Sequence, residues 1–471
     1  MRINFAAPQR IWWQSETVSR AVFLLLLLGL GCSKSKSTWP AEAALSTEPE
    51  AVELFTLERP APTGRFGSEV PLAWFGLVNR LAASQRLTPP VASRILGYGG
   101  VTLYEAVVGG MPGYRSLTGQ LNNIRYVPEA HGKLHWPTVA NNALGVVLKG
   151  LFEANSAAAL SALDSLKEHF NDEFKAEISK EVFFRSALHG KLVGLAILAQ
   201  SRRDGYLKFR NCAFTPSVGP GLWVPTPPAF APALEPYWGE LRPFVLRRGS
   251  ACDPGPHPPY SEDPASAFYL ENKEVYDTTN NLTQGQKDIA LFWADGAGTL
   301  TPPGHSISIL GQIIRDKNLK LDVAAEAYAK VGIAVADAFI SCWNSKFRYN
   351  LLRPITYIRS EIDPNWTPLI ATPPFPEYTS GHSTQSGAAA QVLTDLFGNL
   401  AFTDHTHDAR GFAPRSFSSF IEAADEAAIS RLYGGIHYRA AIEKGLEQGK
   451  CIGSKVSALR FKEREHARAD R

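Results

Sequence analysis

The chain has 471 residues, enough for one large hydrophobic core or two packed halves. Its 48 lysines and arginines nearly balance its 45 aspartates and glutamates, which leaves a net charge of +3. This balance argues against a nucleic-acid partner, because no basic tract and no interleaving of aromatic with basic residues accompanies it.

The N-terminal residues 1–31 have the pattern of a signal peptide. Arginines precede an apolar stretch, residues 21–30, that is too short to cross a bilayer comfortably. The Gly-Cys pair that follows is similar to a bacterial lipoprotein cleavage box, so Cys32 is expected to be lipidated, with ordinary secretion or an uncleaved anchor as alternatives. We therefore expect an exported protein, periplasmic or on the outer surface, that meets the membrane only through its lipid anchor. Residues 32–62 are polar and contain proline, which indicates a flexible tether.

The remaining residues, 63–465, are predicted to form a single all-α domain. Hydrophobic periodicity predicts helices over 71–87, 91–108, 138–152, 157–170, 180–203, 283–294, 322–352 and 383–397. Residues 206–264 are rich in proline and glycine and predict a long ordered loop that wraps the helices. No stretch shows sustained strand alternation, and beyond the N-terminus no run approaches the roughly 20 apolar residues of a membrane span.

Two further features of this domain concern its packing. Cys212 and Cys252 flank an irregular segment and are candidates for a disulfide in an oxidising compartment, a pairing that the sequence leaves open. Cys342 is expected to be a small buried hydrophobe. Asp337 lies within an apolar run and is either a buried, hydrogen-bonded acid or a solvated one.

Three short stretches that lie far apart carry most of the chemistry. They are residues 346–354 (KFRYNLLRP), 379–382 (TSGH) and 430–437 (SRLYGGIH). Together they offer a lysine, arginines, a serine beside a glycine, and two histidines. Lysine supplies a point charge and arginine a planar donor fork, while the histidines suit bonding to a central atom and proton transfer. This set of groups indicates a site for a compact tetrahedral oxyanion.

The spacing within the stretches is consistent with one site. Lys346 and Arg353 are seven residues apart, so both are expected on one face of the same helix, which Pro354 then helps to end. Ser380 and Gly381 precede a predicted helix, and its N-terminus attracts anions through free N–H groups and the helix dipole.

The third stretch contains a break between its two functional side chains. Arg431 and His437 are six residues apart, which would point them in different directions on a continuous helix. Two glycines lie between them, so we expect one helix to end near Tyr433 and His437 to open the next.

The ordered pattern K-x6-R-P, S-G-H and S-R-x5-H resembles the signature shared by vanadium-dependent haloperoxidases and type 2 phosphatidic acid phosphatases. The resemblance implies that Lys346, Arg353 and Arg431 neutralise the equatorial oxygens of the anion, helped by Ser380 and the Gly381 N–H. It also implies paired four-helix bundles, with the site in the C-terminal half at about residues 283–460.

Under the same resemblance, His437 bonds the vanadium or phosphorus atom and His382 acts as the acid–base group. Two positions depart from the family pattern. Thr379 replaces a proline, which a turn tolerates. Ala441 replaces an aspartate that would orient the imidazole of the last histidine, and Glu443 or a carboxylate from elsewhere is the expected substitute.

Several residues favour the haloperoxidase branch of this superfamily. Trp343 and Phe375 match its pattern around the first two stretches, and both are candidates for the surroundings of the halide. The block 291–305 (LFWADGAGTLTPPGH) resembles bacterial members, which makes Asp295 a candidate partner for Arg431. The lipid phosphatases, by contrast, span the membrane repeatedly.

The expected activity is the oxidation of halide by hydrogen peroxide to a hypohalous species, with vanadate as cofactor and a small organic acceptor. Bromide at least is expected as a substrate, and the halide preference and oligomeric state stay open. A phosphomonoester hydrolase that acts through a phosphohistidine and needs no cofactor is the alternative. An inactive oxyanion-binding protein is the third reading.

The other histidines are predicted to have structural rather than catalytic roles. His405 and His407 (DHTHD) are expected in an exposed polar loop rather than at a metal. His305 is expected in a P-P-G-H turn, with some prospect of lining the site.

Overall fold

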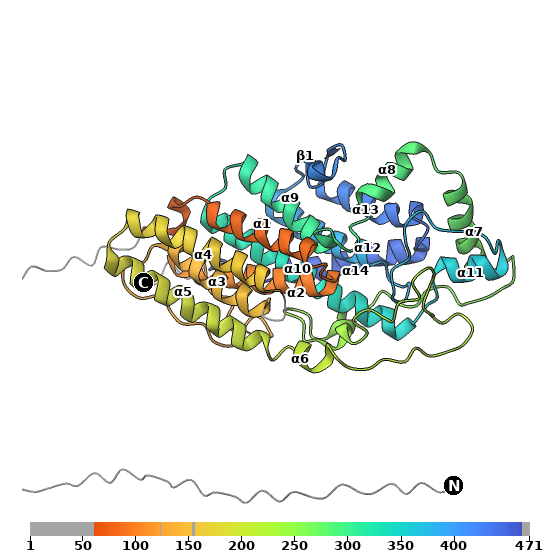
Figure 1. The fold of residues 1–471 in the computed structure, drawn as a ribbon, viewed down its shortest axis with the longest axis horizontal. Coiled ribbons are helices and arrows are strands. Elements are labelled where there is room, and N and C mark those ends of the chain that lie inside the picture. Colours follow the sequence, from red (N-terminus) through yellow and green to blue (C-terminus); the bar gives the residue numbers. More distant parts are fainter. Residues whose placement is uncertain (1–60, 123, 153–155, 464–471) are drawn as a thin grey trace, which may run out of the picture. The chain divides into compact units, whose positions relative to one another are not determined.

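The computed structural model describes residues 61–122, 124–152 and 156–463. The predicted signal peptide, Cys32 and almost all of the predicted tether lie outside these residues. Within them the fold is all-α, as predicted, with fourteen α-helices and one small two-stranded sheet (Figure 1).

Five helices form the N-terminal group. They are α1 (Glu69–Ser84), α2 (Pro89–Val107), α3 (Trp136–Leu151), α4 (Ala157–Glu177) and α5 (Lys180–Ser201), with short 3₁₀ turns η1 (Thr63–Arg65) and η2 (Val108–Gly110). Thr88, Ser156 and Ser179 cap α2, α4 and α5. Each side chain accepts the backbone N–H of the residue three positions further along the chain. Within this group α3 packs mainly on α5 and α2.

The C-terminal group carries the three stretches with functional side chains. Its helices are α7 (Ala267–Asn280), α8 (Gln284–Phe292), α9 (Thr301–Asp316), α10 (Leu321–Tyr349), α11 (Pro354–Glu361), α12 (Gly381–Phe397), α13 (Phe420–Tyr433) and α14 (Arg439–Ser457). A hairpin of β1 (Phe402–Asp404) and β2 (Arg415–Phe417) pairs Phe402 with Phe417, and η5 (Asp408–Arg410) lies in its loop.

Close backbone contacts join these helices. α10 packs along α2, which links the two groups, and α12 packs along α14. A Cβ added at Gly100 of α2 would lie 2.3 Å from the Tyr328 carbonyl of α10, and one at Gly449 of α14 would lie 2.3 Å from the Thr384 carbonyl of α12. Only glycine fits at these two crossings.

The long irregular segment predicted over 206–264 is present, interrupted by α6 (Tyr206–Phe209), η3 (Trp238–Glu240) and η4 (Gly249–Cys252). Asp337 of α10 anchors it, because its carboxylate accepts backbone N–H groups from Phe244, Val245 and Leu246 at 2.6, 2.8 and 3.1 Å. Asp337 is fully buried, which decides between the two positions open from the sequence.

The disulfide differs from the suggested pair. Cys252 bonds Cys451 of α14, 199 residues further on, while Cys212 is exposed and unbonded. Only the tertiary fold brings these two cysteines together. Cys342 is buried, as predicted.

Some elements were not anticipated. α7, α9 and the β1–β2 hairpin have no counterpart among the predicted elements, although Pro302 and Pro303 suit the first turn of α9, where an N–H is not needed. His305 therefore lies on a helix and not in a turn.

Helix α5 is more apolar than we expected from the sequence, which showed no candidate membrane span beyond the N-terminus. It is long and apolar enough to pass a length-and-hydropathy test for a membrane span, and Phe184 and Leu188 are exposed on it. The helix also packs against α3 and α2.

Candidate functional site

Lys346 lies in the last turn of α10 and is fully buried. Its ammonium group donates to the backbone carbonyls of Pro376 and Glu377 at 2.9 and 2.8 Å. Burial lowers the pKa of Lys346 to about 7, with a further contribution from the positive charge of Arg353. The group therefore exchanges its proton near neutrality unless an anion holds it.

Arg353 does not share a helix with Lys346, contrary to the prediction. α10 ends at Tyr349 because Asn350 adopts a left-handed conformation with φ 49°. Pro354 begins α11 instead of ending α10, and Arg353 is the N-cap residue of α11. A seven-residue spacing does not distinguish a continuous helix from a break at a left-handed residue.

The side chain of Arg353 nevertheless turns toward the expected pocket. It is fully buried, and its Nε and Nη1 donate to the carbonyls of Phe375 and Ile436, both at 2.8 Å. Nη1 lies 3.3 Å from Nε2 of His437. Nη2 is buried and has no hydrogen-bond partner among the described residues.

Ser380 and Gly381 begin α12, as the sequence predicts. Ser380 is the N-cap, and its hydroxyl accepts from the Ser383 N–H at 3.3 Å. A Cβ at Gly381 would meet only the Trp343 ring, at 3.8 Å. The space over this helix N-terminus is therefore open to a ligand, toward which the helix dipole is positive.

Arg431 and His382 share one backbone acceptor. Arg431, in the last turn of α13, donates through Nη1 to the Trp293 carbonyl at 2.8 Å, and its Nε has no partner among the described residues. The His382 ring also bonds the Trp293 carbonyl. His382 Nε2 is buried and has no hydrogen-bond partner among the described residues.

Both histidines of the pocket are held neutral. Burial lowers the pKa of His382 well below its usual value, and Arg431 adds to this effect. Burial also lowers the pKa of His437, helped by the charges of Arg353, Lys346 and Arg431. Each imidazole therefore keeps one nitrogen with a lone pair.

The missing carboxylate partner of His437 is Glu377. Its Oε1 accepts the Nδ1–H of His437 at 2.7 Å and the Tyr438 N–H at 3.0 Å, which orients the ring and leaves the lone pair on Nε2. Burial raises the pKa of Glu377, and the positive charges of Arg353 and Lys346 oppose this shift and favour the carboxylate. Glu443 lies outside the site and is near Arg439, at 3.9 Å.

Glu377 was not singled out from the sequence. It lies three residues before Ser380 in P-F-P-E-Y-T-S-G-H, so its position beside a known site stretch was the available signal. Ala441, where the family aspartate is usual, is buried, and its carbonyl accepts the Ser380 N–H at 3.0 Å.

Trp343 and Phe375 form the apolar side of the pocket. Their ring centroids are 4.8 Å apart, and the Trp343 N–H donates to the Leu234 carbonyl at 3.1 Å. Lys346 Nζ and the Arg353 guanidinium lie 5.0 and 4.8 Å from the centroid of the Phe375 ring. These rings shield the two cations from water.

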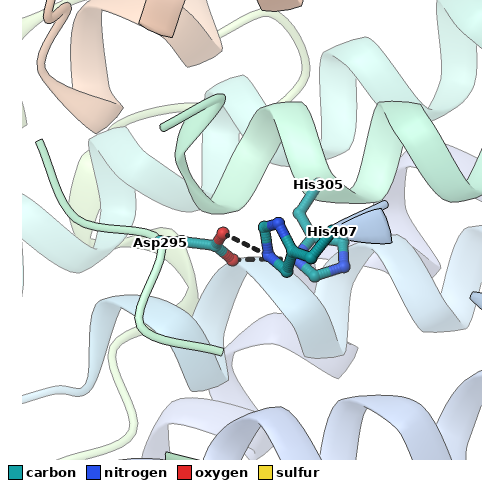
Figure 2. A group of neighbouring side chains, drawn as sticks. All are labelled: Asp295, His305 and His407. Carbon is teal, nitrogen blue, oxygen red and sulfur yellow. Dashed lines mark hydrogen bonds and ion pairs between the residues drawn. The ribbon is translucent and has the colours of Figure 1, made fainter. Parts of the chain in front are cut away.

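Asp295 does not form an ion pair with Arg431 in the described part of the chain. Its carboxylate lies 2.8 Å from Nδ1 of His305 and 3.1 Å from Nε2 of His407, and Figure 2 shows both imidazoles at the same carboxylate. Its negative charge still acts on Arg431. Burial lowers the pKa of Arg431 to about 10, and the charge of Asp295 opposes this shift. His407 is buried, so the prediction of an exposed loop holds for His405 alone.

The site fits a tetrahedral oxyanion. Two buried arginine donors, Arg353 Nη2 and Arg431 Nε, have no protein partner among the described residues, and neither has the ring nitrogen His382 Nε2. Buried cations without partners are costly, and a bound anion removes that cost. The lone pair of His437 Nε2 faces the same cations and offers a bond to the central atom.

The comparisons with known proteins agree with this geometry. A family profile described as the VCPO second helical-bundle domain matches residues 326–464. The vanadium chloroperoxidase of Curvularia inaequalis is 27% identical over 212 residues, which cover 32% of this chain and 35% of that protein. The chain thus matches about a third of that relative's length.

Two solved structures match over much more of the chain. A structure described as the first bacterial vanadium-dependent iodoperoxidase is 39% identical, with a TM-score of 0.79, and the match covers 86% of this chain and 99% of that one. A holo-type bacterial vanadium-dependent chloroperoxidase shares the fold at 14% identity, with a TM-score of 0.60 over 81% of this chain and 95% of that one.

Proposed function

This chain belongs to the vanadium-dependent haloperoxidase family, and we propose that it uses vanadate to oxidise halide with hydrogen peroxide. The observation that carries the proposal is the buried cationic pocket whose arginine donors lack protein partners among the described residues. The 39% identity to a bacterial iodoperoxidase over most of both chains supports it.

The vanadate oxygens are assigned to residues from four separate segments. Lys346, Arg353 and Arg431 would neutralise its equatorial oxygens, since each is buried and directed into the pocket. Ser380 and the Gly381 N–H would add hydrogen bonds at the N-terminus of α12. When bound, vanadate supplies a Lewis acid that activates peroxide without a change in the redox state of the metal.

His437 and Glu377 act as a unit in this proposal. Glu377 accepts the Nδ1–H at 2.7 Å, so that Nε2 presents its lone pair to the metal. Because the carboxylate also accepts the Tyr438 N–H at 3.0 Å, it holds the ring and the adjoining backbone together.

His382 is the proton-transfer group. Burial keeps its ring neutral, and Nε2 has no hydrogen-bond partner among the described residues. It therefore takes the proton that hydrogen peroxide loses and returns it to the leaving water, a task suited to imidazole.

Iodide and bromide are the halides that we propose, because iodide is the most easily oxidised and a relative that is 39% identical over 86% of this chain is described as an iodoperoxidase. The hypohalous product would then react with a small organic acceptor. Trp343 and Phe375 give the halide an apolar approach to the cations.

The deciding experiment uses protein that begins at Ser33, with and without added orthovanadate. We expect oxidation of iodide by hydrogen peroxide only in the vanadate-loaded protein. Steady hydrolysis of an aryl phosphate, inhibited by vanadate, with no halide oxidation would favour the phosphatase reading. Measurable phosphate affinity with neither activity would favour an inactive oxyanion-binding protein.

We also propose that the protein is exported and anchored through a lipid on Cys32. The Cys252–Cys451 disulfide supports this proposal, since disulfides persist in oxidising compartments. Incorporation of a radiolabelled fatty acid, abolished by Cys32→Ala, is the expected result. Equal labelling of the variant would contradict it.

A further inference from the structure

Helix α5 carries several large apolar side chains that the protein leaves exposed. Phe184, Leu188, Leu192 and Leu195 have exposed fractions of 67, 57, 44 and 45%. No other helix in the described ranges has more than one large apolar residue in this exposed class. Single exposed apolar residues are common on protein surfaces, whereas a group of them on one element marks an interaction site.

These four side chains lie in a single row, which we call the α5 stripe. At about 100° per residue, they fall within an arc of roughly 80° around the helix axis. Leu195 is eleven positions after Phe184, and at about 1.5 Å per residue the stripe is roughly 17 Å long. The stripe is therefore continuous along three turns of the helix.

The opposite side of α5 is held against α3. A Cβ added at Gly190 would lie 2.3 Å from the Val139 carbonyl of α3, and one at Gly194 would lie 2.7 Å from the Ala143 carbonyl. Only glycine allows the two helices to approach so closely. Figure 1 shows α5 at the edge of the N-terminal group, so the α5 stripe faces outward from a helix whose other side is fixed.

Basic side chains border the α5 stripe. Lys180, Arg185 and Lys191 are exposed on α5, against a single acid on this helix, Glu181. At about 100° per residue, Lys191 and Arg185 lie on opposite sides of the stripe, each roughly 20° beyond its edge. An apolar row between basic side chains is the pattern of a helix that lies in the interface of a membrane.

The loop before α3 adds an aromatic and a further basic residue beside α5. The Gln200 side chain accepts the Arg125 N–H at 2.6 Å and donates to the Tyr126 carbonyl at 3.0 Å. Arg125 and Tyr126 are both exposed. Tyrosine is enriched where lipid meets water, and basic side chains attract anionic head groups.

A second copy of the chain is the other candidate to cover the stripe. With a helix diameter of about 10 Å, the stripe spans on the order of 170 Å². A stable protein interface takes about 800 Å² from each partner. An identical copy would also bring a border of the same sign of charge, whereas anionic head groups supply the countercharge and admit side chains one at a time.

We propose that the α5 stripe is a membrane-docking face, on which α5 lies parallel to a bilayer that contains anionic lipids and inserts its apolar side chains among the acyl chains. The lipid proposed on Cys32 would bring the protein to such a bilayer. Residues 33–60, at about 3.3 Å each, allow a separation of up to about 90 Å, so the anchor leaves this face free to turn toward the lipid.

The test uses protein that begins at Ser33 and therefore carries no lipid. Co-sedimentation with vesicles of phosphatidylglycerol and phosphatidylethanolamine gives its partition coefficient, and vesicles of phosphatidylcholine give the value without anionic lipid. Leu188→Glu and Leu192→Glu alter the stripe. Leu270→Glu on α7 is the matched control, because the exposed fraction of Leu270 is 56%.

We expect the native protein and the Leu270→Glu control to bind the anionic vesicles equally. Each stripe variant should bind about 10-fold more weakly or less, because a leucine that leaves water for an apolar medium contributes a factor of this order. Binding of the native protein should also weaken on phosphatidylcholine and at higher ionic strength, since both reduce the attraction of the basic border.

No binding of the native protein to anionic vesicles would overturn the proposal, and so would equal binding by the stripe variants and the control. A dimer of the native protein in sedimentation equilibrium that Leu188→Glu dissociates would overturn it as well, because a second copy would then cover the stripe. These measurements need neither vanadate nor the lipid on Cys32, so failure of halide oxidation or of lipidation remains distinguishable from failure of this inference.

Discussion

Two buried polar clusters lie side by side in the C-terminal group of helices, and they are built in opposite ways. In the oxyanion pocket, Lys346, Arg353 and Arg431 bring positive charge, and Nη2 of Arg353 and Nε of Arg431 lack partners among the described residues. The second cluster consists of Asp295, His305, Asp404 and His407, all of them buried, and we call it the carboxylate–histidine cluster. In it, both ring nitrogens of His305 face carboxylates, at 2.8 and 2.7 Å. Burial is the same in both, so it does not distinguish a ligand site from a structural one.

What distinguishes them is whether the protein supplies the countercharges. A buried charge with its partners in place stabilises one arrangement of the chain. Buried donors without protein partners are costly, and a bound anion removes that cost. Asp295, His305 and His407 have the spacing of metal ligands, yet both ring nitrogens of His305 already face carboxylates. The predictions below separate the two clusters experimentally.

The largest effect is expected from removing the bond to the central atom. His437→Ala should abolish stable vanadate loading, because no other lone pair in the pocket is held in this position by a carboxylate. Equilibrium dialysis with orthovanadate measures it, and His405→Ala, at an exposed histidine, is the control. Unchanged loading would remove His437 from the site.

His382→Ala should separate binding from turnover. Vanadate affinity should change little, while kcat for iodide oxidation falls by about 10²–10⁴-fold, the usual contribution of a general acid–base group. Steady-state kinetics at saturating vanadate provide the measurement. Full activity would show that another group moves the proton.

Glu377→Gln should have a smaller effect than the loss of His437 itself. The amide can no longer fix the His437 tautomer by charge, so vanadate affinity should fall by about 10–100-fold. Glu443→Gln is the matched control, because Glu443 lies outside the site beside Arg439. Equal dissociation constants for the two variants would assign the orienting role elsewhere.

The two clusters should respond to pH in opposite directions. The folded pKa of His305 is raised to about 10, so its stabilisation is complete below its unfolded value near 6.5 and is lost as the pH rises toward 10. The folded pKa of Lys346 is lowered to about 7, so its contribution to the free energy of unfolding increases between pH 7 and its unfolded value near 10.5.

Urea unfolding of the vanadate-free protein between pH 7 and 10 tests this contrast. The native protein's advantage over His305→Gln should shrink as the pH rises, and its stability relative to Lys346→Met should improve. Parallel pH profiles for all three proteins would show that neither charge is held as described. These changes are expected to be the smallest of the set.

Much of the oxyanion pocket was accessible from local sequence. Ser380 as the cap of α12 and the end of α13 at Tyr433 follow from short-range capping and glycine patterns. The helix break between Lys346 and Arg353 could not be predicted in this way. A left-handed Asn350 competes with a continuous helix, and the sequence pattern permits both. Glu377 was missed because its role depends on a partner 60 residues away.

The carboxylate–histidine cluster shows more clearly which contacts local sequence patterns do not predict. His305 and Asp404 are 99 residues apart, and no periodicity links a helix turn to the end of a short strand. Likewise, Cys252 bonds Cys451 and not the nearer Cys212. Long-range pairing is decided by which segments the packed helices bring together.

The amino-acid sequence by itself determined the helical class, the three stretches with functional side chains and the type of ligand they suit, because periodicity, caps and residue chemistry act over short distances. Tertiary structure alone decided which carboxylate orients His437, which histidine is paired and which is exposed, and which donors remain without partners. Those outcomes depend on burial and on contacts between distant segments, where the loss of water makes each unpaired charge costly and each pair selective.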